Sequence, residues 1–291
     1  MTKTVFVFLY IVVYNEKNKA MPEPGGCFVK KGISQEGLKL IACVTMLIDH
    51  VGYELIYPIY SSMSLVSATD LPVVKLIYNM YLLCRCIGRI SFPIFAFLLV
   101  EGIHHTRNRV GYALRLAIGM FLAEIPYDLV VAGEISWQKQ SIMVTLLLGF
   151  CAVILMEKCR SLAWKPVVLL PVAVLAEVLH VSYGWEGILL IALFELSREM
   201  YNPNLVRTGG MIVLFHYMSS SILRVRNFTL PMQVLGVLSM LFIANYDGRK
   251  MTHSKILQWG FYLFYPVHLL ILWIIGQLIS GVFMMGISIA I

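Results

Sequence analysis

Apolar stretches long enough to cross a lipid bilayer recur along the whole chain, with short polar segments between them. A helix needs about 20 apolar residues to cross the hydrocarbon core. The stretches are too continuous for the short alternating strands of a β-barrel. The pattern therefore predicts an all-α, polytopic bundle of transmembrane helices with about nine spans. The expected spans are residues 37–57, 76–102, 110–133, 141–157, 162–181, 184–200, 208–222, 229–246 and 256–280.

The two ends of the chain are less regular than its middle. The last apolar run continues to Ile291, so it is either one long ninth helix or a ninth helix followed by a short tenth one. Residues 1–35 are predicted to be a cytoplasmic N-terminal segment, and residues 36–291 one transmembrane domain. Within the first segment, Val5–Tyr14 is apolar but too short to span. It is either a signal-peptide core without a cleavage site, or part of a stretch that precedes a start at Met21.

Basic residues indicate the orientation in the membrane. Of the 23 Lys and Arg, only Lys75, Lys139, Arg224 and Arg226 fall in loops on the side opposite the N-terminus. Cytoplasmic loops carry the excess of basic residues, so we expect a multi-pass cell-membrane protein with a cytoplasmic N-terminus. Only 13% of residues are charged and 59% are hydrophobic, which excludes an ordinary soluble enzyme. The net charge of +7 is then a topology signal and does not indicate nucleic-acid binding.

Several charged side chains lie within the expected spans, where they are costly and mark functional sites by default. Lys39 and His50 are eleven residues apart on one face of the first span, about 16 Å along its axis. Arg85 and Arg89 share a face of the second span because they are four residues apart. Asp49 points to another face, and we expect it to pair with a different helix.

Two further spans add polar groups at similar depth. Glu124 and Asp128 could neutralise the two arginines, while Tyr265 and His268 belong to a polar stripe in the last span. A mid-membrane histidine such as His50 beside unpaired arginines suggests proton transfer near an anion. The alternative is that these charges form ion pairs that hold the bundle together. No metal site is predicted, because no span has His and Cys at ligand spacing.

These residues belong to motifs that occur in order over about residues 36–275. The motifs are Leu38–Ala42, Met46–His50, Ile87–Phe97, Val100–Gly102, His105–Asn108, Tyr112–Leu116, Glu124–Asp128 and Phe261–Leu270. Together they resemble the TraX family, whose named activity is N-acetylation of the amino terminus of conjugative pilin. The spacing of Lys39 and His50 also resembles the basic-x10-His motif of acyltransferase family 3 membrane enzymes. The chain departs from the family at Ser141 and Ser182, which suggests a different acceptor.

The resemblance implies a membrane acyltransferase that uses acetyl-coenzyme A as its acyl donor. His50 is then the general base, Arg89 with Arg85 stabilises the oxyanion, and Asp49 holds this geometry. Tyr265 and His268 orient the thioester or protonate the leaving thiolate. The coenzyme A phosphates are expected to meet cations at the cytoplasmic mouth of the bundle. These cations are Lys39, Arg107, Arg115, Arg249 and Lys250.

The acceptor and the reaction class stay open at this point. The acceptor carries an amine or a hydroxyl, with N-acetylation favoured, and is a peptide N-terminus, a glycan or a small molecule. The competing function is a transporter or permease in which the buried charges form a proton or solute pathway. The absence of an internal repeat argues mildly against a transporter. A non-catalytic scaffold would leave the charges at similar depth unexplained.

Overall fold

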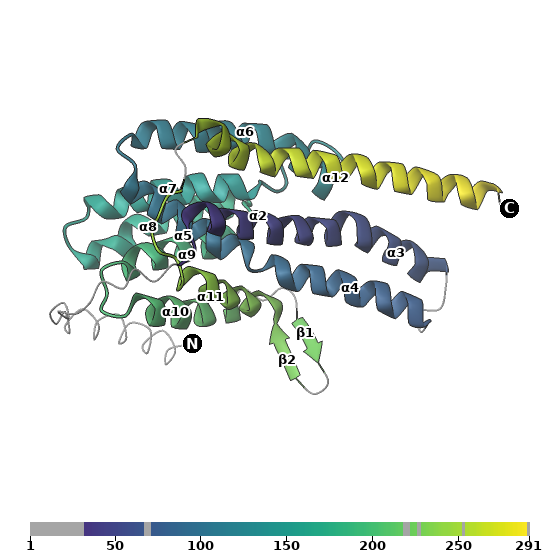
Figure 1. The fold of residues 1–291 in the computed structure, drawn as a ribbon, viewed down its shortest axis with the longest axis horizontal. Helices are drawn as coiled ribbons and strands as arrows, with labels where there is room; N and C mark the ends of the chain where they lie inside the picture. The colour runs from purple at the N-terminus through teal and green to yellow at the C-terminus, as the bar shows by residue number, and fades with distance from the viewer. Residues whose placement is uncertain (1–31, 67–70, 218–221, 226–227, 252–253, 290–291) are drawn as a thin grey trace.

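The computed structural model describes residues 32–66, 71–217, 222–225, 228–251 and 254–289, and it is almost entirely helical (Figure 1). The expectations for residues 1–31, including the short apolar segment, lie outside these described residues. The helices are α2 (Gln35–Val51), η1 (Gly52–Ile56), α3 (Tyr57–Val66), α4 (Pro72–Gly88), α5 (Ser91–His105), α6 (Arg109–Val131), α7 (Ile142–Lys158), η2 (Leu162–Trp164), α8 (Lys165–Val178), α9 (Gly184–Ser197), α10 (Pro203–Tyr217), η3 (Met232–Ser239), α11 (Met240–Ile243) and α12 (Lys255–Ile289). Strands β1 (Ile222–Val225) and β2 (Phe228–Pro231) form one antiparallel hairpin.

Three helical stretches among the described residues are long and apolar enough to cross a membrane: Gln35–Ser64, Pro72–His105 and Lys255–Ile279. The all-α class is therefore confirmed, and the molecule has the helices of a membrane protein. The count of nine spans stays a prediction, because α8, α9 and α10 have 14, 14 and 15 residues and are shorter than a full span. The cytoplasmic N-terminus stays a prediction as well.

The prediction of one helix over residues 229–246 is wrong for residues 229–239. The chain there forms β2, whose Pro231 pairs with Ile222 at the end of the hairpin, and then the 3-10 helix η3. Proline has no N–H group, so it is excluded from a helix interior but is tolerated at the end of an edge strand. In η3, Gly236 packs closely: a Cβ placed there would lie 2.8 Å from Phe215 and 3.0 Å from the carbonyl oxygen of Arg89.

The expected span over residues 76–102 is interrupted in the middle. Helix α4 ends at Gly88 and α5 begins at Ser91, and the amides of Arg89 and Ile90 donate to carbonyls only three residues earlier. Pro93 lies in the first turn of α5, where its missing N–H costs nothing. The break places the Arg89 side chain at the junction of two helices, beside η3.

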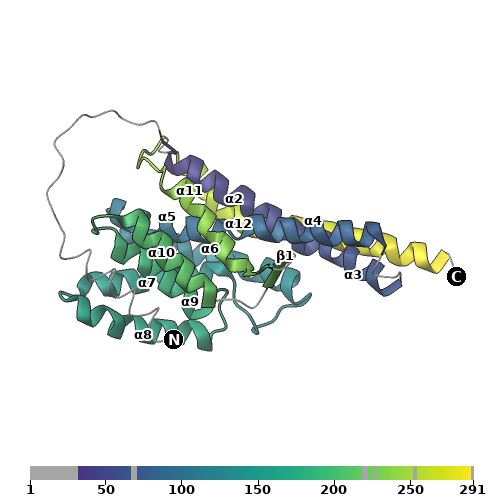
Figure 2. The same ribbon diagram turned by 90° about the horizontal axis from the view of Figure 1, so that it is seen from below.

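Part of the molecule extends beyond the compact helical bundle (Figure 1). Helices α3 and α4 and the later part of α12 run side by side beyond the rest of the bundle, and we call this part the arm (Figures 1 and 2). The compact part holds the core around α5, in which Phe92, Ile94 and Ile103 are fully buried. Helix α12 is 35 residues long and passes from the compact part into the arm.

Candidate functional site

A cavity of about 260 Å³ lies between α2, α5, α6, α7 and α12. At one end of it the first turn of α2 meets the loop before α12, because the amide of Gln35 donates to the carbonyl of Arg249. Lys39, Arg115 and Lys250 are the Lys and Arg side chains that line the cavity. Glu36 lines the cavity beside them, and Tyr265 and the start of α7 line it as well. Three cations and one carboxylate thus line a cavity that is otherwise largely apolar.

Two of these cations, Lys39 and Arg115, lie over aromatic rings that also line the cavity. The Nζ atom of Lys39 lies 5.4 Å from the ring centre of Phe261, and the guanidinium carbon of Arg115 lies 5.7 Å from that of Tyr112. The Nε atom of Arg115 is buried and has no hydrogen-bond partner among the described residues. A buried cationic N–H without an acceptor is the arrangement expected of a site for an anionic ligand.

The other two cations expected at the cytoplasmic mouth do not line the cavity. Arg249 is bound to Asp247, with its Nη2 atom 2.5 Å and its Nε atom 2.7 Å from Oδ2. Arg107 is exposed in the short turn between α5 and α6, next to the cavity residue Thr106. The structure therefore brings three of the five predicted phosphate ligands to the cavity itself.

The histidines of the first and last expected spans are in direct contact. The Nδ1 atom of His50 lies 2.6 Å from the Nε2 atom of His268, and the two rings are stacked. The Nδ1 atom of His268 lies 2.6 Å from the carbonyl oxygen of Phe264, which can only accept. The hydrogen on His268 therefore lies on Nδ1, and its Nε2 accepts the hydrogen of His50 Nδ1. In this neutral pair the Nε2 atom of His50 carries the lone pair and can accept a proton.

Tyr265 connects the histidine pair to the cavity. Its ring centre lies 6.2 Å from that of His50 and 5.7 Å from that of His268, and its side chain is buried. Tyr265 also lines the cavity, whereas neither histidine is among the cavity-lining residues, so Tyr265 lies between the imidazoles and the cavity. That Lys39 and His50 belong to one path stays a prediction.

Asp49 and two arginines form an ion cluster beside the histidine pair. The Nη1 atom of Arg85 lies 2.5 Å from Asp49 Oδ2, and the Nη2 atom of Arg89 lies 3.9 Å from Asp49 Oδ1. Arg89 also donates from Nε to the carbonyl of Arg85 at 3.2 Å and from Nη1 to Gln233 Oε1 at 3.0 Å. The expectation of unpaired arginines is therefore wrong, and the partner helix that Asp49 was expected to find is α4.

A glycine on α4 makes room for this cluster. A Cβ atom at Gly88 would run into the side chain of Asp49. Position 88 therefore lets α2 and α4 approach closely enough for Asp49 to reach Arg85. Neither Gly88 nor Gln233 is anticipated from the sequence, although a single glutamine in the otherwise apolar stretch of η3 is a usable signal.

The acidic residues of α6 do not neutralise the arginines. Glu124 accepts hydrogen bonds from the hydroxyl and the amide of Ser141 at 2.6 and 3.2 Å, and Asp128 accepts from the amide of Ser136 at 3.1 Å. Ser182 binds the hydroxyl of Tyr127 at 2.9 Å. The two serines that depart from the family pattern thus contact side chains of α6, at the end of α7 nearest Tyr265.

Comparison with known proteins identifies the family. The family model described as "TraX protein" matches residues 34–276. The chain belongs to the TraX family. This TraX protein is also 27% identical over 209 residues to the "Probable fimbrial assembly protein FimC, serogroup H1" of Dichelobacter nodosus, which covers 65% of the chain and 80% of the relative. No solved structure matches the chain.

Proposed function

We propose that this TraX protein is a membrane acyltransferase that moves an acetyl group from cytoplasmic acetyl-coenzyme A to the amino terminus of a pilus or fimbrial subunit. The single observation that carries the proposal is a cavity lined by three cations, whose lining residue Tyr265 contacts a buried histidine pair. The cations are Lys39, Arg115 and Lys250. Membership of the TraX family and the name of the fimbrial relative support the acceptor class.

The mouth suits the phosphate groups of coenzyme A. Charge-assisted hydrogen bonds from ammonium and guanidinium groups are the strong contacts that phosphates make in proteins. The unpartnered Nε atom of Arg115 supplies one such donor. The largely apolar lining of the cavity suits the pantetheine arm. The arm would extend along the face of α2 on which Lys39 and His50 are about 16 Å apart. The thioester then lies beside Tyr265.

His50 serves as the general base in this scheme. Its Nε2 atom takes a proton from the acceptor amine while the amine nitrogen attacks the thioester carbonyl carbon. The C–N bond forms, and the carbonyl electrons move to oxygen as a tetrahedral intermediate. When that intermediate collapses, the C–S bond breaks and the coenzyme A thiolate leaves with the proton held by His50. His268 fixes the tautomer of His50 and is a positioning residue.

The arginines stabilise the negative charge of the intermediate. Asp49 and Gln233 fix Arg89 from two directions, so its guanidinium is held before the reaction begins. Such preorganised donors are worth about 10²–10³ in rate for acyl transfer. Arg85 shares the charge of Asp49 and keeps the cluster net positive beside the reacting carbonyl.

The test is acetyl transfer by the purified full-length protein in detergent. The protein receives acetyl-coenzyme A and a short peptide with a free amino terminus, and the released thiol and the acetylated peptide are both measured. We expect His50→Ala to lower the rate about 10²–10⁴-fold and Arg89→Ala about 10²–10³-fold. The matched control is His216→Ala, because His216 is an exposed histidine on α10, which does not line the cavity.

Two results would overturn the proposal. One is a wild-type rate in a His50→Ala protein that unfolds at the wild-type temperature. The other is a folded wild-type protein that consumes no acetyl-coenzyme A with any amine or hydroxyl and gains no thermal stability from coenzyme A. The second result would favour a transporter.

A further inference from the structure

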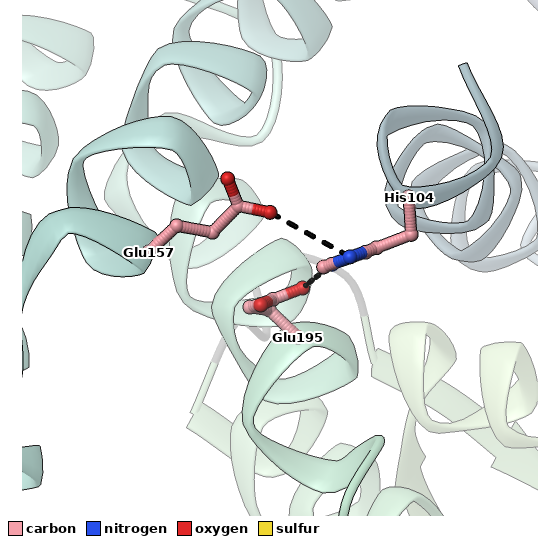
Figure 3. A group of neighbouring side chains, drawn as sticks. All are labelled: His104, Glu157 and Glu195. Atoms are coloured by element: carbon pink, nitrogen blue, oxygen red, sulfur yellow. Dashed lines mark hydrogen bonds and ion pairs between the residues drawn. The ribbon is translucent and has the colours of Figure 1, made fainter. Parts of the chain in front are cut away.

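A second cluster of titratable side chains lies at the opposite end of α5 from Arg89 (Figure 3). It consists of His104 on α5, Glu157 on α7 and Glu195 on α9, and we call it the His–Glu–Glu cluster. The Nε2 atom of His104 lies 2.7 Å from Glu195 Oε2, and its Nδ1 atom lies 3.5 Å from Glu157 Oε1. One nitrogen and one oxygen from each carboxylate all lie within 4.8 Å of one another.

The two carboxylates of this cluster differ in their partners: Glu157 is paired with Arg109, whereas no arginine is paired with Glu195 among the described residues. The Glu195 side chain is only 10% exposed, and among the described residues the ion pair recorded for it is with His104 alone. Arg198, on the following turn, is directed to Glu101 at 3.4 Å. A nine-tenths buried carboxylate with a second carboxylate nearby is costly unless a cation lies between them.

Glu157 is held in place by a neighbour from α6. The Nη1 and Nη2 atoms of Arg109 lie 2.5 and 3.1 Å from Oε2 and Oε1 of Glu157. This two-point contact fixes the plane of the carboxylate, and the Oε1 atom that accepts from Arg109 also faces the Nδ1 atom of His104. Side chains of this kind, hydrogen-bonded to a ligand from outside, orient the ligands of many metal sites.

We propose that the His–Glu–Glu cluster binds one divalent transition-metal ion, with Zn²⁺ as the favoured ion. One imidazole nitrogen and two carboxylate oxygens are ligands that zinc takes in proteins, and water completes the coordination. The ion replaces the direct hydrogen bond between His104 and Glu195 and neutralises the charge of Glu195, which no arginine balances among the described residues. It joins the ends of α5, α7 and α9. The ligands come from three helices, so no spacing within one helix reveals them.

The test is zinc binding to the full-length protein in detergent after treatment with a chelator. Isothermal titration with Zn²⁺ is expected to show one equivalent bound by the wild type. Glu195→Gln and His104→Ala should each weaken this binding at least tenfold. The control is His105→Ala, which changes the adjacent histidine, whose side chain is 62% exposed and faces Glu101. His105→Ala should bind Zn²⁺ as the wild type does.

Glu195→Gln guards against simple loss of the fold, because the amide can still hydrogen-bond to His104 while losing the charge. We also expect Zn²⁺ to raise the unfolding temperature of the wild type and of His105→Ala, but not that of Glu195→Gln. The proposal is overturned if no stoichiometric binding occurs, or if Glu195→Gln binds as tightly as the wild type. It is also overturned if only His50→Ala abolishes binding, because the zinc then occupies the histidine pair.

Discussion

His50 and His268, which are 218 positions apart in the chain, share a hydrogen bond of 2.6 Å that joins α2 to α12. The carbonyl of Phe264 orders this pair from one side, so that a single ring nitrogen, Nε2 of His50, is left to accept a proton. In the proposed mechanism, His50 is the base and His268 is the residue that orients it, so mutation can test the two roles independently.

Replacing His268 should slow acetyl transfer without weakening the binding of acetyl-coenzyme A. In His268→Ala the tautomer of His50 is no longer fixed, so kcat should fall by more than about tenfold. The loss should stay smaller than that of His50→Ala, for which about 10²–10⁴-fold is expected. KM for acetyl-coenzyme A should change little. His268→Gln, whose side chain can still accept from His50, should recover part of the rate. Equal losses in both variants, or a loss confined to KM, would contradict a positioning role.

Gly88→Ala should destabilise the protein. The added methyl group meets the side chain of Asp49, so either the ion cluster shifts or α2 and α4 separate. Overpacking of this kind costs about 1–3 kcal/mol, which thermal unfolding in detergent can measure. Gly260→Ala is the matched control, because nothing lies within 4 Å of a Cβ placed there on α12. Its stability should equal or slightly exceed that of the wild type.

Lys250→Ala and Lys39→Ala should weaken the binding of coenzyme A. Each variant removes a cation from the cavity mouth, and the effect should diminish as salt is raised, because screening reduces the attraction in the wild type. Titration of coenzyme A by calorimetry measures the dissociation constant, and we expect it to rise about tenfold. Lys139→Ala, in the exposed loop before α7, should bind coenzyme A normally. A normal dissociation constant in both mouth variants would mean that coenzyme A binds elsewhere.

Acid should loosen the loop before α12. The side-chain hydrogen bond from Arg249 lowers the pKa of Asp247, and Asp247 also accepts from the amide of Gly32 at 3.1 Å. Because the folded pKa lies below the unfolded value of about 3.9, the ionised carboxylate contributes stability above that value, and this contribution is lost as the pH falls through the folded pKa. Unfolding temperatures of the wild type and Asp247→Asn should therefore differ at pH 7 and converge in acid. A difference that is unchanged down to pH 3 would contradict this account.

The depth of the candidate site could be predicted from the sequence, because the rise of a helix is constant. Counting residues on α2 alone places Lys39 and His50 at two depths of one helix face, and in the structure Lys39 lines the cavity while His50 contacts its lining residue Tyr265. The ion-pair partners could not be predicted in the same way. Glu124 and Asp128 have suitable spacing, but α4 packs against α2 at that level, so Asp49 is the carboxylate that reaches Arg85.

The ends of two elements, β2 and α4, depend on individual residues and are not predicted by hydropathy alone. The apolar residues of β2 and η3 have the hydropathy of a span, yet Pro231 ends a strand there. Helix α4 ends at Gly88 although the apolar run continues. Side chains brought together from three helices, such as His104 and Glu195, leave no pattern along the chain at all.

The length of α12 has a consequence for where the acceptor arrives. Its 35 residues span about 52 Å, well beyond the ~30 Å of bilayer hydrocarbon. With Lys255 at the cytoplasmic boundary, as the loop charges predict, His268 lies about 20 Å along the helix axis. The imidazoles then sit about 10 Å from the outer edge of the hydrocarbon, and under the proposed function the acceptor's amino group crosses that depth from the external surface to reach His50.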